Sequence, residues 1–95
     1  MNTTTTFRLA PQLLAQFDLD EAVLLDEALG RYFAANPVAS LILCACRDGL
    51  SRDHISARIV RQFRVDKVQA DADLDHFLVD MVARGFLIPA IGAAA

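Results

Sequence analysis

The side chains able to do metal or catalytic chemistry are few in this sequence, and their spacing does not match a known site. Cys44 and Cys46 stand two residues apart in an apolar segment, and on a helix such a spacing turns two side chains about 200° apart. We therefore expect two reduced, buried, structural thiols rather than a disulfide or a shared metal. His54 and His76 lie in different segments without a zinc-type spacing, and are interpreted as solvated surface residues.

Enzyme chemistry is not indicated by the remaining residues. The four glycines stand singly at expected turns and helix ends, so that no glycine-rich phosphate loop is present. No Ser/His/Asp or Cys/His set is recognisable. We expect no catalytic residues, no metal ligands and no cofactor in this chain.

Length and composition predict one small domain. The 95 residues can form a single core, and the apolar fraction of 55% indicates either a compact core or an apolar groove kept for a partner. Residues 1–6 lack the basic and apolar regions of a signal peptide, and no apolar run reaches the roughly 18 residues of a membrane helix. A cytoplasmic location without a membrane partner is expected.

The first half of the chain has the pattern of an antiparallel sheet. Residues 13–19 alternate between apolar and polar side chains, and residues 22–25 are almost wholly apolar. Residues 31–34 follow Gly30, which can adopt the positive φ that a hairpin loop requires. Residues 7–9 are expected to add a short edge strand.

The second half has the periodicity of three helices, over residues 37–47, 52–63 and about 69–84. Asn36 can cap the first helix, and Gly85 can end the last one. Three antiparallel strands followed by three helices predict an α+β protein with a winged helix-turn-helix fold, and an unclassified small α+β domain is the alternative.

The predicted domain covers residues 13–88. Residues 1–12 are interpreted as a flexible N-terminal arm and residues 89–95 as a flexible tail.

A winged helix suggests DNA binding, but the charge of the third helix opposes it. That helix would enter the DNA groove, and it carries four aspartates and one arginine, namely Asp71, Asp73, Asp75, Asp80 and Arg84. Basic residues outnumber acidic ones in residues 47–67, which could contact an acidic partner, although a solvated helix face is the simpler interpretation. A DNA-binding regulator is kept only as an alternative.

Peptide binding fits these features better. The strand at residues 31–34 is expected to be a sheet edge, which can accept a guest strand beside the third helix. Tyr32 and Phe33 on the strand, and Leu74 and Phe77 on the helix, are the candidate walls, while the aspartates would attract a basic segment. Leu74 and Phe77 also fit the core pattern, so at least one of them is expected in the core. Self-pairing of the same edge, giving a homodimer, is an alternative.

The sequence resembles the PqqD-like proteins over about residues 13–88. The similar motifs are, in order, Leu24-Leu25-Asp26, Gly30-Arg31-Tyr32-Phe33, Asn36-Pro37-Val38-Ala39-Ser40, Asp48-Gly49 before Ser51, Phe63-Arg64-Val65-Asp66, Ala70 with Asp73-Leu74 and Phe77-Leu78, and Arg84-Gly85-Phe86-Leu87. Each motif is weak alone, but their order and spacing together are specific.

Proteins of this family are recognition elements for ribosomally made, modified peptides (RiPP recognition elements). The resemblance implies a winged helix that binds the leader of a precursor peptide as an added strand and hands it to maturation enzymes. The peptide-binding residues implied by position are Arg31, Tyr32, Phe33, Ala34, Ala70, Asp73, Leu74 and Phe77.

Within this family, the sequence resembles the stand-alone leader-binding proteins of lasso-peptide clusters, which work with a separate leader protease and a cyclase. The Pro-Glu-Gly turn associated with the quinone-cofactor branch is replaced here by Asp26-Glu27-Ala28-Leu29-Gly30. Ala35 stands where a larger apolar residue is usual, which implies a wider local pocket. A radical-enzyme pathway is the alternative, and catalysis is expected from a partner in either case.

Overall fold

The computed structural model describes residues 3–18 and 21–93 of the chain. Strands β2 (Leu14–Asp18), β3 (Glu21–Asp26) and β4 (Arg31–Ala35) form an antiparallel sheet in the order β2-β3-β4. In the β3–β4 hairpin, Asp26 lies opposite Arg31, and Gly30 adopts a φ of 63°. The predicted three-stranded sheet is confirmed, although residues 19 and 20 lie outside the described residues.

Three helices follow the sheet, as predicted: α1 (Pro37–Arg47), α2 (Arg52–Phe63) and α3 (Lys67–Ala83). Asn36 caps α1 by accepting a 2.8 Å hydrogen bond from the backbone N–H of Ala39. Helix α3 begins two residues earlier than expected, because Asp66 caps it by accepting from the N–H of Gln69 at 2.8 Å. The α+β winged helix-turn-helix fold is confirmed.

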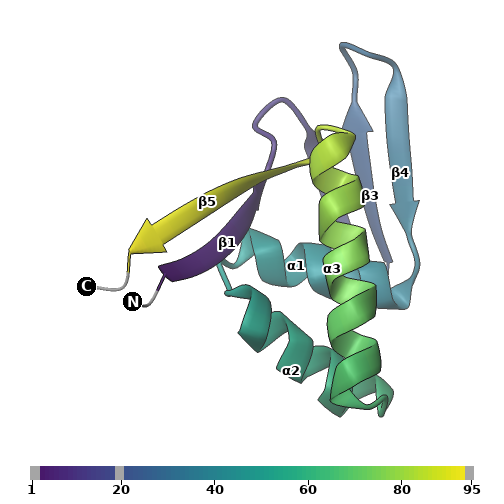
Figure 1. Cartoon of the computed structure of the whole chain (residues 1–95). Helices are drawn as coiled ribbons and strands as arrows, with labels where there is room; N and C mark the ends of the chain where they lie inside the picture. The colour runs from purple at the N-terminus through teal and green to yellow at the C-terminus, as the bar shows by residue number, and fades with distance from the viewer. Residues whose placement is uncertain (1–2, 19–20, 94–95) are drawn as a thin grey trace.

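The two ends of the chain form a second sheet that the sequence analysis did not predict. Strands β1 (Thr3–Leu9) and β5 (Leu87–Ala93) pair antiparallel, from Thr3 opposite Ala93 to Leu9 opposite Leu87. Figure 1 shows them side by side, with both termini at the same end of the molecule. We expected a flexible arm at residues 1–12 and a flexible tail at residues 89–95, but Thr3–Leu9 and Leu87–Ala93 are paired strands. The short strand expected at residues 7–9 lies within β1, and residues 1, 2, 94 and 95 lie outside the described residues. Each strand supplies the hydrogen-bonding partner of the other, and this long-range pairing leaves no local sequence pattern.

The hydrophobic core lies between the three-stranded sheet and the helices. Alternate residues of β3 are buried, and the largest wholly buried apolar side chains are Leu24, Ile42, Leu43, Ile55, Leu74, Met81 and Leu87. The helix α1 covers the sheet face that carries Leu24. Both cysteines are free in the structure; Cys46 is buried, as expected, whereas Cys44 is only half-buried.

Candidate functional site

Strand β4 is an edge of its sheet in the described structure, because β3 is its one neighbour there. One row of β4 backbone N–H and C=O groups therefore has no strand partner. Figure 1 shows β4 as the outermost strand, on the side of the molecule away from β1 and β5. The edge predicted from the sequence at residues 31–34 is present.

A groove of about 470 Å³ lies beside this edge, and three elements line it. Its lining residues are Phe33 and Ala34 of β4, Asn36, Val38, Ala39 and Ile42 at the start of α1, and Asp73 and Phe77 of α3. The ring centroids of Phe33 and Phe77 lie 6.1 Å apart, so the strand wall and the helix wall meet there. The groove is mainly apolar, and Asp73 gives it a carboxylate.

Four of the eight residues predicted to bind a peptide line this groove: Phe33, Ala34, Asp73 and Phe77. Ala70 and Leu74 are 0% exposed and belong to the core, so their prediction as wall residues is corrected. Both face the inside of the helix packing, where the apolar stripe of α3 is needed to close the core. The expectation that Leu74 or Phe77 is a core residue is thus met by Leu74.

Tyr32 lies on the opposite face of the sheet from the groove. It pairs with Leu25, whose side chain is exposed, whereas Phe33 pairs with the buried Leu24. Successive strand residues point to opposite faces, and the side chain of Tyr32 is not among those that line the groove. Tyr32 is 72% exposed, and its side chain is corrected from a groove residue to an outer-face residue.

The side chain of Arg31 has a structural task that the sequence did not indicate. Its guanidinium donates to the carboxylate of the buried Asp26 at 3.3 Å and to the backbone oxygen of Arg84 at 2.8 Å. It also lies over the ring of Phe86, 4.8 Å from the centroid. Arg31 thereby joins the start of β4 to the end of α3, the two elements that supply the strand wall and the helix wall of the groove.

Asp26 remains ionised in this setting. Burial raises the pKa of Asp26, but hydrogen bonds from the backbone N–H of Leu29 and from Arg31 outweigh it, so that the pKa lies below its ordinary value. The carboxylate at the hairpin is therefore charged at neutral pH and holds Arg31 in place.

The aspartates of α3 divide into structural ones and one that faces the groove. Asp75 receives two hydrogen bonds from Arg52, at 2.7 and 2.8 Å, and these join α3 to α2. Asp71 pairs with Lys67 at 2.8 Å, and Asp80 pairs with Arg84. Asp73 accepts from the side chain of Gln69 and has no ion pair within the described residues.

The start of α1 is the part of the groove that the sequence analysis missed. Val38 and Ile42 have helical spacing but were not predicted as site residues, and Asn36 was interpreted only as a cap. All three also line the groove, because α1 begins directly after β4 and passes beneath its edge. The Asn36-Pro37 sequence could have indicated this part of the groove, because it places the start of α1 directly after the end of β4.

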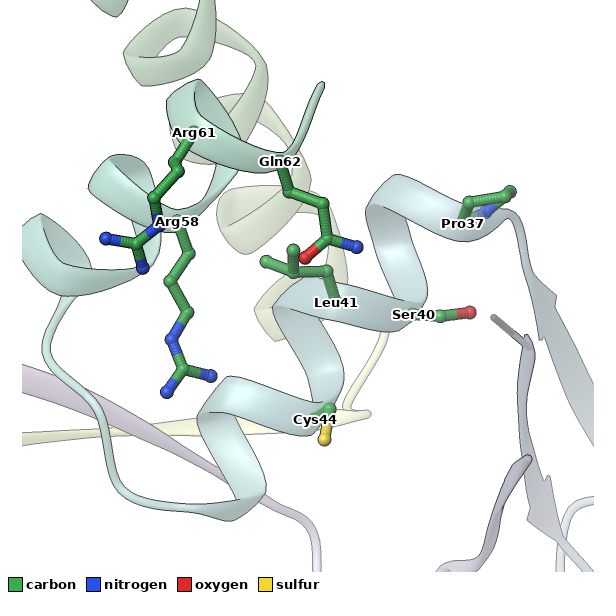
Figure 2. Close-up of a pocket in the computed structure, with 7 residues that line it drawn as sticks. All are labelled: Pro37, Ser40, Leu41, Cys44, Arg58, Arg61 and Gln62. Carbon is green, nitrogen blue, oxygen red and sulfur yellow. The ribbon is translucent and has the colours of Figure 1, made fainter. Parts of the chain in front are cut away.

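A second pocket, of about 380 Å³, lies between α1 and α2 (Figure 2). Figure 2 shows the side chains of Arg58 and Arg61 extending from α2, and Cys44 and Leu41 on α1. The two arginines form no ion pair within the part of the chain that the structure describes. Among the basic residues of 47–67, Arg52 thus joins α2 to α3, Lys67 pairs with Asp71 within α3, and Arg58 and Arg61 line this pocket.

Within residues 3–18 and 21–93, no group of three or more His, Cys, Asp or Glu side chains could hold a metal ion. The described helices include none that is long and apolar enough to cross a membrane.

A winged helix with an open sheet edge beside an apolar groove is the arrangement of a peptide-binding module. Residues 21–87 match the family model of coenzyme PQQ synthesis protein D (PqqD), and the chain belongs to this family. None of the curated proteins matches the sequence.

Two solved structures are similar over nearly the whole chain. One is described as lasso peptide synthetase B1 complexed with the leader peptide. Its sequence is 26% identical and its TM-score is 0.78, and the match covers 86% of this chain and 96% of the other chain. The other is TbiB1 in complex with the TbiA(beta) leader peptide. Its sequence is 26% identical and its TM-score is 0.79, and the match covers 93% of this chain and 99% of the other chain. Both relatives were captured with a leader peptide.

Proposed function

We propose that this chain binds the leader segment of a ribosomally synthesised precursor peptide as an added strand on β4. The free edge of β4 would supply main-chain hydrogen bonds along residues 31–34, and the adjoining groove would hold one or two apolar leader side chains. The observation that carries the proposal is the groove between a free strand and α3, in a chain similar to two proteins complexed with leader peptides.

The role is presentation of the leader to maturation enzymes, without bond making by this chain. Lasso-peptide maturation is favoured over a radical-enzyme pathway, because both similar structures carry leader peptides and one is a lasso peptide synthetase B1. The family description, coenzyme PQQ synthesis, supports the second pathway as the alternative. DNA binding is disfavoured because the four aspartates of α3 outnumber its one lysine, and this net negative charge would repel the phosphates that the helix would have to approach.

Fluorescence anisotropy tests the proposal. The labelled leader from the neighbouring precursor gene is titrated with the full chain, alongside a scrambled leader and a short DNA duplex. Saturable binding of the native leader alone is expected. Salt-sensitive binding of the duplex, with no binding of the leader, would assign the same fold to a regulator.

A further inference from the structure

The guanidinium of Arg31 connects the start of β4 with the residue that ends α3. Its Nη1 group donates to the backbone oxygen of Arg84 at 2.8 Å, and its Nη2 group donates to the carboxylate of Asp26 at 3.3 Å. Within the described residues, the bond to Arg84 is the one hydrogen bond between β4 and residues 67–84. This contact therefore holds the end of α3 to the strand.

Phe86 extends this contact to the walls of the groove. Arg31 lies 4.8 Å from the centroid of the Phe86 ring, and the Phe86 ring lies 6.1 Å from the ring of Phe33. Phe33 in turn lies 6.1 Å from the ring of Phe77. Phe33 and Phe77 line the groove, whereas Arg31 and Phe86 do not. The side chain of Arg31 can thus act on both groove walls without lining the groove itself.

The stability of the free chain does not account for the placement of Arg31. The Nε atom of its guanidinium is buried and has no hydrogen-bond partner within the described residues. A buried N–H group without an acceptor lowers stability, and such a group in a native fold requires an explanation. A role at the groove explains this geometry, in which two nitrogens reach Asp26 and Arg84 while the third is left unpaired.

We infer that Arg31 is a positioning residue for leader binding, which holds α3 and, through Phe86, the Phe33–Phe77 pair at the separation that the leader side chains require. The leader touches the two groove rings, and Arg31 acts through them. Walls that are held in place before binding lose less conformational freedom when the peptide binds, so losing Arg31 lowers leader affinity. This inference rests on the proposed function, since it concerns the affinity of the groove for the leader.

The test compares Arg31→Lys with Arg52→Lys in the full chain. Lysine keeps a positive charge opposite Asp26, but it lacks the planar fork with which arginine contacts several groups at once. Arg52 is the matched control, because its fork holds Asp75 at 2.7 and 2.8 Å and joins α3 to α2 outside the groove.

The labelled leader from the neighbouring precursor gene is the probe, and its anisotropy is measured at a temperature at which circular dichroism shows every variant folded. Arg31→Lys is expected to lower leader affinity about fivefold or more, while Arg52→Lys stays within about twofold of the wild type. A loss of affinity that only reflected a weaker fold would appear in both variants.

The geometry of the groove gives a second readout in the chain without leader. Nuclear Overhauser effects between the ring protons of Phe33 and Phe77 report how closely the two walls approach. They are expected to weaken in Arg31→Lys and to stay unchanged in Arg52→Lys. Unchanged ring contacts in Arg31→Lys would contradict a positioning role, whatever its thermal midpoint.

A second variant guards against misfolding of the first. Arg31→Gln combined with Asp26→Asn removes the guanidinium without leaving a buried carboxylate unpaired, and it should lose leader affinity to the same extent. Wild-type affinity in both Arg31 variants, or equal losses in Arg31→Lys and Arg52→Lys, would overturn the positioning role while leaving leader binding intact. Failure of the wild type to bind the leader at all would instead overturn the proposed function.

Discussion

Phe33 of β4 and Phe77 of α3 meet with their ring centroids 6.1 Å apart and their planes tilted by 52°. Phe33 also lies 6.1 Å from the ring of Phe86, which follows α3. The strand wall and the helix wall of the groove are thus held together by aromatic contacts before any peptide arrives. A groove formed in advance loses less conformational freedom on binding, which favours affinity.

Asp73 is predicted to contribute charge to leader binding without supporting the fold. Its exposed carboxylate contacts Gln69 and lines the groove. Asp73→Asn is expected to weaken leader binding about fivefold, or about 1 kcal/mol, with little change in thermal midpoint. Anisotropy measures the affinity, and Asp53→Asn on α2 serves as the control because Asp53 is 89% exposed and outside the groove. Equal affinities for Asp73→Asn and the wild type would exclude Asp73 from the site.

Leu74 is predicted to act on stability alone. Leu74 is on the core-facing side of α3 and its side chain is wholly buried. Leu74→Ala therefore leaves a cavity and is expected to lower the free energy of unfolding by about 2–5 kcal/mol. Urea unfolding measures this loss. Leader affinity, measured at a temperature where the variant is folded, should match the wild type. A selective loss of leader affinity without destabilisation would return Leu74 to the groove.

The stability of the fold is predicted to fall at acidic pH through Asp71. Hydrogen bonds from Lys67 and Ser56, with the charge of Arg52, lower the pKa of Asp71 from 3.8 to about 2. The unfolded chain therefore takes up this proton at a higher pH than the folded chain. The stabilisation is complete above the unfolded pKa and is lost as the pH falls from about 4 to about 2.

Asp71→Asn provides the comparison for this pH dependence. The thermal midpoints of the variant and the wild type are measured from about pH 2 to about pH 7, a range that covers the titration of Asp71 in the folded and unfolded chain. The variant should be less stable at neutral pH, and the difference should shrink as the pH falls. A difference that stays constant over the whole range would contradict the lowered pKa.

The two thiols are predicted to differ in reactivity. Burial raises the pKa of the Cys46 thiol to about 12, so at pH 8 only about one Cys46 side chain in 10⁴ is the reactive thiolate. Cys44 is half-buried and faces the pocket between α1 and α2. Iodoacetamide labelling followed by mass spectrometry of the folded chain should modify Cys44 first. Equal labelling rates in the folded chain would show that Cys46 is accessible.

Local patterns predicted the elements of this fold well. The alternation of residues 13–19, the Asn36 cap and the turn at Gly85 each depend on neighbouring residues, and the strands of the three-stranded sheet and the helices lie within a few residues of their predicted bounds. The β1–β5 pairing joins residues that lie 78 to 90 positions apart in sequence, as in the Thr6 hydrogen bond to Ala90. Nothing within either segment alone indicates its partner.

The site was predicted less completely, for a geometric reason. Helical periodicity places Leu74 and Phe77 on one apolar stripe, but only the packing angle of α3 decides which of them faces the core and which the groove. Tyr32 could have been separated from Phe33 by the period of two along a strand. The pairing of Arg31 with Asp26 requires the hairpin register, which fixes these two residues opposite each other.

Amide hydrogen exchange on β4 tests strand addition most directly. In the full chain saturated with leader peptide, the outward-facing amides of residues 31–35 should exchange at least tenfold more slowly than in the free chain, because they gain hydrogen-bonded partners. The amides at the other sheet edge, in residues 14–18, serve as the internal reference and should be unchanged. Saturating leader that protects β2 instead, or leaves β4 exchange as fast as before, would contradict leader binding by strand addition to β4.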